Sequence, residues 1–397
     1  MLSTQPQLRI AIVGAGLAGL SLARTLQQND ISCTVYELDS SPDSRPQGGS
    51  LDLHTETGQL ALRNNGLWDT ILPHMRYEGQ DLRILDKTGK VWYDEIVGPE
   101  RDERPEVDRG ILRQTYLDSL KDGTIHWETR IKEIISENDK EVTADPQQRS
   151  RFKLVFAHGE EETFDVVVGA DGAWSRIRAF LSDVKPTYTG ITFFETALLN
   201  VDQEFPEESK LVGRGTATIL SDMKGLLLQR NGDGSVRNYI ALRIPEDHYS
   251  PKQVSDESFV RQRLFEQFSD WSDDLKAIVT KGQGLIHRKI NTLPPDHRWT
   301  SRPGVTIIGD AAHLMSPFAG EGANLAMIDG VDLGDAIVKV VKQGADLAIV
   351  QEEFEKSMMA RSQRASEMSA SNLEMFFSDD AAYKLTAFFE QHMNHEA

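Results

Sequence analysis

Residues 8–19 read Leu8-Arg9-Ile10-Ala11-Ile12-Val13-Gly14-Ala15-Gly16-Leu17-Ala18-Gly19 and contain the pattern Gly-x-Gly-x-x-Gly. The pattern follows an apolar segment of strand character and precedes residues 17–26, whose apolar side chains have helical spacing. A second strand is expected over residues 32–37. The sequence therefore predicts a βαβ unit, the building block of a parallel sheet.

Each glycine of the pattern has its own physical reason. Gly14 permits a tight turn, Gly16 lets a pyrophosphate approach the backbone, and Gly19 lets the helix pack closely against the strand. The helix N-terminus then faces the phosphates. Glu37, at the end of the second expected strand, would accept hydrogen bonds from the ribose hydroxyls of an adenosine. The motif indicates a dinucleotide site but does not separate FAD from NAD.

Two later expected strands also end in clusters of glycine and aspartate. Residues 164–168 lead into Gly169-Ala170-Asp171-Gly172, and residues 305–308 lead into Gly309-Asp310. Ligands of open α/β sheets bind at the carboxyl ends of the strands. We therefore expect three strand ends that are remote in sequence to converge on one ligand.

The segments 169–178 and 309–324 together resemble the group A flavoprotein monooxygenases, the family of aromatic hydroxylases. By this resemblance the dinucleotide is FAD, and Asp310 binds its ribityl chain. Asp171, with Arg178 downstream, resembles the family's Asp-Gly motif, which handles both FAD and NAD(P)H. The loop and helix start under the isoalloxazine ring would comprise Pro317, Gly320, Glu321, Gly322, Ala323 and Asn324. Backbone N–H groups there would stabilise the negative charge of reduced flavin.

Within the family the sequence is most similar to the tetracycline-inactivating monooxygenases, on segments 48–54, 106–113 and 314–320. That similarity implies that Asp52 and Arg113 contact FAD and that Arg45 helps to hold NADPH. The sequence departs from the family at three positions, where Leu38 replaces Arg, Ser316 replaces Pro and Glu321 replaces Gln. The side chains that grip tetracycline are not identifiable within residues 211–244, so the expected substrate is a small phenolic, enolic or polyketide-like molecule, tetracycline-like compounds included.

The expected fold class is α/β, with a Rossmann-like FAD-binding domain of the GR2 type, an inserted antiparallel β-sheet domain for substrate and a long C-terminal helix. The FAD-binding domain is discontinuous and would comprise residues 1–75, 105–186 and 289–335. The substrate-binding domain is expected at residues 76–104 and 187–288. There the sequence pattern changes to alternating strand-like segments separated by turn residues. A helical segment fills residues 336–397, with one helix from about 347 to 375.

Composition excludes several classes of protein. The chain has 397 residues and a formal charge of −19, which disfavours nucleic acid and anionic membrane surfaces as partners. Cys33 is the only cysteine, so intrachain disulfides and cysteine-based metal clusters are excluded, and it is interpreted as a core residue. No apolar segment approaches the ~20 residues that span a bilayer, and residues 1–7 lack a signal peptide's features. A cytoplasmic, monomeric protein without a metal site is expected.

The hypothesis for the reaction is that NADPH reduces FAD, O₂ forms a flavin C4a-hydroperoxide, and a small organic substrate is hydroxylated. No second Gly-x-Gly-x-x-Gly in a suitable context exists, so NADPH is expected to bind transiently at the surface. No side chain is assigned to catalysis; His313, without an identifiable acidic partner, is interpreted as structural. Candidates to line the substrate pocket are Met315, Pro317, Phe318 and Met375.

Two alternative functions remain open at this point. One is a flavin oxidase or dehydrogenase on the same cofactor-binding domain, without oxygen insertion. The other is a binding protein that has kept the domain and lost the flavin.

Overall fold

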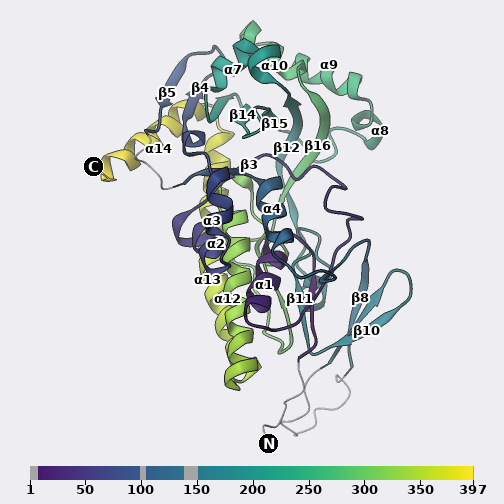
Figure 1. The fold of residues 1–397 in the computed structure, drawn as a ribbon. Helices are drawn as coiled ribbons and strands as arrows, with labels where there is room; N and C mark the ends of the chain where they lie inside the picture. Colours follow the sequence, from purple (N-terminus) through teal and green to yellow (C-terminus); the bar gives the residue numbers. More distant parts are fainter. Residues whose placement is uncertain (1–7, 99–103, 138–150, 397) are drawn as a thin grey trace, which may run out of the picture.

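The computed structural model describes residues 8–98, 104–137 and 151–396 (Figure 1). One end of the molecule contains a seven-stranded sheet, the other contains a parallel sheet, and two long helices run along the body beside it (Figure 1). Residues 1–7, where the sequence predicts no signal peptide, lie outside the described residues. Within the described part, no helix combines the length and the apolar composition that crossing a bilayer requires.

The parallel sheet has the strand order β17-β11-β1-β2-β7. Its strands are β1 (Ile10–Val13), β2 (Thr34–Tyr36), β7 (Ile125–His126), β11 (Val166–Gly169) and β17 (Val305–Ile307). The register places Val13 beside Gly169 and Gly169 beside Ile307. The carboxyl ends of β1, β11 and β17, the three strands that end in the glycine and aspartate clusters, therefore lie next to one another, as expected from the sequence.

Helices and a small sheet cover the parallel sheet. Helix α1 (Leu17–Gln28) packs against α12 (Gly322–Gln343), and α4 (Arg109–Asp118) packs against α1. The antiparallel strands β8 (Ile131–Ser136), β9 (Phe152–Phe156) and β10 (Glu161–Phe164) contribute apolar side chains to the same core, aromatic ones from β9 and β10. Strands β1 and β11 are buried throughout, which explains their continuous apolar sequence.

The strand expected over residues 164–168 is in fact two strands. Strand β10 ends at Phe164 in the antiparallel sheet, and β11 begins at Val166 in the parallel sheet. Asp165 separates them, and its carboxylate accepts a hydrogen bond from the backbone N–H of Arg9 at 2.8 Å. The apolar run alone could not reveal this change of sheet.

The seven-stranded sheet has the order β16-β12-β15-β14-β13-β4-β5. Its strands are β4 (Leu82–Leu85), β5 (Val91–Glu95), β12 (Thr187–Leu198), β13 (Thr216–Ser221), β14 (Lys224–Arg230), β15 (Val236–Arg243) and β16 (Gln283–Thr292). Neighbouring strands pair antiparallel, as predicted, except that β13 and β4 are parallel. Strand β4 lies far from β13 in sequence, so no local sequence pattern predicts that the two strands pair.

The two faces of the seven-stranded sheet have different neighbours. Phe194, Leu226 and Ile240 on one face pack in a core with Val260 and Leu275, which belong to α9 (Glu257–Gln267) and α10 (Asp273–Thr280). The shorter helices beside this region are α6 (Val201–Glu204), α7 (Pro206–Val212) and α8 (Pro251–Val254). The other face carries Phe193, Ala241 and Tyr239, which pack with Phe318 and Leu373 and so turn toward the cofactor-binding half of the chain.

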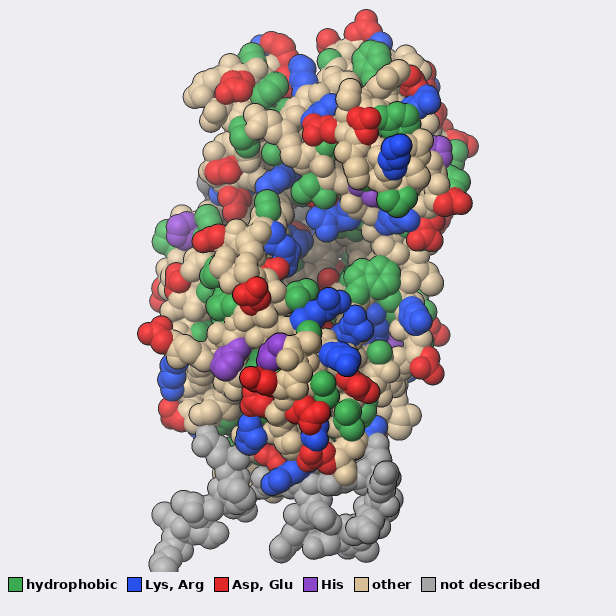
Figure 2. Space-filling model, turned by 90° about the vertical axis from the view of Figure 1, so that its right-hand side faces the viewer, with side chains coloured by type: hydrophobic (Ala, Val, Ile, Leu, Met, Phe, Trp, Pro, Cys, Tyr) green, Lys and Arg blue, Asp and Glu red, His purple; other side chains and the backbone are tan. Residues whose placement is uncertain are grey.

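Between the two halves the surface is hollowed, and Lys and Arg side chains gather around the opening (Figure 2). A two-stranded sheet of β3 (Ser50–Asp52) and β6 (Glu106–Asp108) connects the halves. Its sequence neighbours are a π-helical turn at Thr55–Gln59, α2 (Leu60–Asn64) and α3 (Trp68–Ile71).

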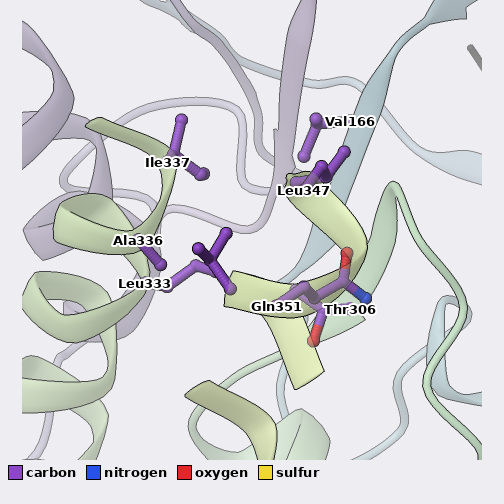
Figure 3. Close-up of a pocket in the computed structure, with 8 residues that line it drawn as sticks. Val166, Thr306, Leu333, Ala336, Ile337, Leu347 and Gln351 are labelled. Atoms are coloured by element: carbon purple, nitrogen blue, oxygen red, sulfur yellow. The ribbon is translucent and has the colours of Figure 1, made fainter. Parts of the chain in front are cut away.

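Three helices end the chain. The predicted helix over residues 347–375 is confirmed as α13 (Leu347–Phe376), which follows α12 and precedes α14 (Ala381–Glu396) (Figure 1). A small pocket of about 10 Å³ lies between α12, α13 and the parallel sheet (Figure 3). It has room for about one water molecule and is lined mainly by apolar side chains, so it is a packing gap and not a cofactor site.

Candidate active site

The glycine turn after β1 is shaped by very close backbone contacts. Gly14 has φ +108°, and a Cβ added there would lie 2.2 Å from the carbonyl oxygen of Ala170. A Cβ added at Gly19 would lie 2.1 Å from the carbonyl oxygen of Gly14. At Gly16 nothing lies within 4 Å of the added Cβ. Gly14 and Gly19 are thus required by chain packing, whereas Gly16 leaves space open in front of α1.

Glu37 lies at this turn, as the spacing predicts. Its Oε2 accepts a hydrogen bond from the N–H of Ala15 at 2.6 Å, and its Oε1 accepts one from Asp39 at 2.9 Å. A carboxylate has about four acceptor positions, so ribose hydroxyls can still be bound. The structure places the residue correctly, and its contact with the ribose stays a prediction.

Arg113 reaches the same turn from α4. Its Nε donates to the carbonyl oxygen of Ala15 at 3.2 Å, and its Nη1 donates to that of Pro42 at 3.0 Å. Burial lowers the pKa of this guanidinium. Arg45 is exposed and pairs with Asp39 at 2.9 Å. Arg45 and Arg113 line one open hollow of about 580 Å³ beside the turn.

Asp310 lies close to the turn after β1, although 291 residues separate it from Gly19 in sequence. A Cβ added at Gly309 would lie 3.0 Å from the Cβ of Ala18, so the Gly309–Asp310 turn rests on the start of α1. The Asp310 side chain is open to solvent, yet the surrounding protein raises its pKa by desolvation. The Asp310 carboxylate is therefore open to solvent on one side and surrounded by protein atoms on the others.

Asp171 and Arg178 link the second cluster to the other two. Asp171 accepts hydrogen bonds from Ser175 Oγ at 2.5 Å and from the N–H of Arg176 at 2.7 Å. Arg178 is buried, and its Nη1 donates to the carbonyl oxygen of Ala311 at 3.0 Å. Arg178 therefore holds the second cluster against the third, whereas the hydrogen bonds of Asp171 stay within its own loop.

The loop that begins α12 is held by a buried imidazole. His54 contacts Asp52 through Nε2 at 2.7 Å and Glu321 through Nδ1 at 3.2 Å. Burial alone lowers the pKa of His54, but the hydrogen bonds to Asp52 and Glu321 outweigh burial and raise the pKa to about 9. Asn324 accepts from the N–H of His54 at 3.0 Å and donates to the carbonyl oxygen of Asp52 at 2.9 Å. The structure thus brings predicted Asp52 and Asn324 together through His54, which sequence reasoning assigned no role.

Helix α13 holds the other end of this loop. Ser316 Oγ lies 2.5 Å from Ser369 Oγ, and Asn372 donates to the carbonyl oxygen of Phe318 at 2.8 Å. Proline, the residue that the resemblance leads one to expect at position 316, could not make the first contact. The contacts from α13 were not predictable from the loop sequence.

The four residues predicted to line the substrate pocket lie in different surroundings. Phe318 is buried against Phe376 and Phe377. Met315 is half-buried and Pro317 is exposed, next to the same loop. Met375 packs in a separate cluster with side chains of β4, β13 and α14. Contact with substrate stays a prediction for Met315, Pro317, Phe318 and Met375.

The statement that His313 lacks an acidic partner is wrong. His313 Nε2 lies 2.5 Å from Asp329 Oδ2, and both side chains are buried. Asp329 also accepts from the N–H of Gly309 at 3.1 Å and from Arg361 of α13 at 2.9 Å. The partner was missed because it lies on the helix that follows the loop, and only the fold of that loop brings the two together.

The Gly309–Asp310 turn lies between the start of α1 and the first turns of α12, because a Cβ added at Gly309 would lie 3.0 Å from Ala18 Cβ and 3.4 Å from Ala326 Cβ. We call the space in front of these segments the cofactor cleft. A family model described as FAD binding domain matches residues 7–367. The chain belongs to this family. The predicted resemblance to the group A flavoprotein monooxygenases is thereby confirmed.

Individual members of the family match along nearly the whole chain. Monooxygenase asqM of Emericella nidulans is 30% identical, with 95% of this chain and 97% of the relative covered. The structure of Klebsiella pneumoniae HpxO with FAD and uric acid has a TM-score of 0.77 at 21% identity, covering 96% of this chain and 92% of that chain. Tetracycline destructase Tet(55) has a TM-score of 0.74 at 18% identity, covering 98% and 96%. The two solved structures show that the fold is shared.

The residues of this family member fit FAD. The space in front of Gly16 is open at the N-terminus of α1, where a pyrophosphate binds favourably. Asp310 offers acceptor oxygens in the cofactor cleft, and the 22-residue helix α12 begins beside it. The site therefore offers groups of suitable chemistry for the phosphates, the polyol and the flavin ring of FAD.

Buried Glu106 gives this family member a testable pH dependence. Burial, together with the charge of Asp52, raises the pKa of Glu106 from 4.5 to about 7. The folded state therefore holds this proton more tightly than the unfolded state does. Its contribution to stability is complete below pH 4.5 and is lost as the pH rises to about 7, at most about 3 kcal/mol in all.

We expect E106Q to remove that loss. In urea unfolding at pH 5 and pH 8, the wild type should lose more unfolding free energy at pH 8 than E106Q does. E160Q, which changes an exposed glutamate, serves as the control and should follow the wild type. An unchanged pH dependence in E106Q would show that Glu106 is ionised throughout this range.

Proposed function

We propose that this protein is a FAD-dependent, NADPH-consuming monooxygenase that adds one atom of O₂ to a small phenolic, enolic or polyketide-like substrate. The observation that carries the proposal is the cleft in which three strand ends meet the α12 loop below the aromatic face of the seven-stranded sheet. Bound FAD would supply hydride acceptance and activation of O₂. The chain supplies binding, orientation and exclusion of water.

The proposed roles of the chain follow the cleft. The Gly16 turn binds the pyrophosphate, Glu37 accepts from the ribose, and Asp310 accepts from the ribityl chain. The N-terminus of α12, fixed by the contact of His54 with Glu321, stabilises negative charge on the reduced ring. Phe318, which lies 6.0 Å from Phe193 between ring centroids, keeps water from the reacting centre.

NADPH has no dinucleotide-binding unit of its own in this proposal. The open hollow lined by Arg45, Gln47 and Arg113 offers cations beside the cofactor cleft. Guanidinium groups bind phosphate through paired hydrogen bonds, which suits the 2′-phosphate of NADPH. We therefore assign this hollow to transient docking of the nicotinamide cofactor.

The relatives are consistent with a small planar substrate. The curated relative asqM is named a monooxygenase, and the HpxO structure holds uric acid together with FAD. The tetracycline destructases share the fold at an identity too low to transfer their substrate. Phenols, enolic polyketides and tetracyclines therefore all belong in the test panel.

The test measures three properties of the purified protein. We expect a yellow protein with bound FAD, NADPH oxidation that a panel compound stimulates, and a product one oxygen atom heavier by mass spectrometry. D310A should lose most bound FAD, whereas D335A, on the same half of the chain but in α12, should retain it. An oxidised product without added oxygen would establish the oxidase alternative, and failure to bind FAD would establish the binding-protein alternative.

A further inference from the structure

A polar cluster faces the cleft from the seven-stranded sheet and centres on Gly49. A Cβ added at Gly49 would lie 2.9 Å from Gln229 Oε1, 2.9 Å from the hydroxyl of Tyr239 and 3.2 Å from Arg237 Cγ. Gly49 immediately precedes β3 and is buried. Three side chains of β14 and β15 thus converge on a backbone position that has no side chain.

These side chains share the aromatic face of the sheet. The register sets Arg237 opposite Gln229 and Tyr239 opposite Leu227, and directly opposed residues of antiparallel strands point to the same face. The rings of Tyr239 and Phe193 lie 5.8 Å apart, and those of Phe193 and Phe318 lie 6.0 Å apart. An aromatic surface therefore extends from the polar cluster to the loop before α12.

Arg237 differs from the other polar side chains nearby. Arg288 pairs with Glu195, and Gln229 donates to Glu106 at 3.3 Å. Arg237 Nε is buried without a hydrogen-bond partner, and no ion pair to Arg237 occurs among the described residues. A buried donor without an acceptor costs free energy, so its environment is suited to an acceptor that comes from outside the chain.

Charges of both signs surround the Tyr239 hydroxyl. Burial and the charge of Glu195 raise the pKa of Tyr239, while Arg109, Arg237 and Arg288 act in the opposite direction. Three guanidinium groups thus act on this hydroxyl, and only Arg288 among them has a carboxylate partner in the structure's described part. Figure 2 shows Lys and Arg side chains around the hollow between the two halves, although the chain as a whole carries a charge of −19.

We infer that the cluster binds an anionic oxygen of the substrate, either an ionised phenol or enol or a ring carboxylate. Arg237 forms the ion pair, Tyr239 donates a hydrogen bond, and the planar body of the substrate lies against Phe193 and Phe318. The inference rests on the proposed function and specifies its substrate class as a planar organic anion. Neutral molecules of the same shape would leave Arg237 without a partner.

The test uses FAD-loaded protein and the absorbance change of the bound flavin as the measure of binding. The probes are 4-hydroxycoumarin, an acidic enol, 2-naphthoate, a carboxylate, and 4-methoxycoumarin, their neutral counterpart. We expect at least one anion to bind about ten-fold or more tightly than the neutral probe, because a hydrogen bond to a charged group is stronger than one to a neutral group. Comparison of the two anions identifies the source of the oxygen.

Variants then locate the binding site. R237M should weaken binding of the preferred anion about ten-fold or more and leave the neutral probe nearly unchanged. Y239F keeps the ring against Phe193 and should weaken only the anion, which also provides a test if R237M does not fold. R263M is the matched control, because Arg263 is a surface residue of α9 on the far face of the sheet.

Two results would overturn the inference. One is equal binding of anionic and neutral probes, or no binding of either. The other is that R237M and Y239F both behave like R263M. If such protein still binds FAD and oxidises NADPH, the proposed function stands without the inference, whereas protein that cannot bind FAD removes both.

Discussion

Replacing Gly16 by valine is expected to weaken FAD binding by about 100-fold or more while lowering the unfolding midpoint by only about 3 °C. The reason is that the space at this position is open in the protein alone, with nothing within 4 Å of an added Cβ. Its backbone is extended, with φ −81° and ψ 179°, a conformation that valine adopts readily. The added side chain would stand where the pyrophosphate must approach the N-terminus of α1.

Gly19 is the matched control for this experiment. A Cβ there would lie 2.1 Å from the Gly14 carbonyl oxygen and 3.2 Å from Ile12 Cγ2. G19V should therefore destabilise the fold itself by about 3–5 kcal/mol. Thermal unfolding and FAD titration of both variants separate the two roles. If G16V bound FAD normally, the pyrophosphate would have to bind elsewhere.

Replacing Asp329 by alanine is expected to cost about 3–5 kcal/mol of unfolding free energy. The carboxylate is buried and accepts from His313, from Arg361 and from the N–H of Gly309. Its removal leaves the buried imidazole of His313 and the partly buried guanidinium of Arg361 without their shared anion. Because the Gly309–Asp310 turn also loses its anchor, FAD affinity should fall together with stability.

Asp332 provides a close comparison, since it pairs with the same Arg361 at 2.8 Å but is partly exposed. D332A should cost less than about 1 kcal/mol, the range of exposed ion pairs. Urea unfolding and FAD titration of both variants measure the difference. Equal, small effects of the two substitutions would mean that the Asp329 network contributes little to the turn.

Much of the fold could be predicted from local patterns. The βαβ unit, the strand leading to Asp310 and the helix expected from about 347 to 375 follow from apolar spacing and glycine positions, and all three are present. The strand at 164–168 was predicted wrongly, because Phe164 and Val166 are equally apolar yet belong to different sheets. The parallel pairing of β13 with β4 depends on how two segments distant in sequence meet, and the periodicity of apolar residues does not predict it.

The candidate site divides in the same way. Residues whose task is set by backbone geometry, such as Gly14 and Gly19, were found from spacing, since a tight turn leaves a pattern within a few positions. Residues that act through partners far away in sequence could not be found from spacing. His54 meets Glu321, and Tyr239 meets Arg237 beside Gly49, only when strands and loops far apart in sequence are packed together.

By itself the sequence determined that a dinucleotide turn, two further strand ends and a flavoprotein-like loop exist in this chain. Only the tertiary structure decided that they lie next to one another, that His313 has Asp329 as its partner, and that Arg237 Nε is buried with no hydrogen-bond partner in the described part of the chain. The physical reason is the distance along the chain over which each kind of interaction acts. Backbone conformation is set by neighbours along the chain, whereas burial, charge pairing and hydrogen-bond satisfaction are set by neighbours in space.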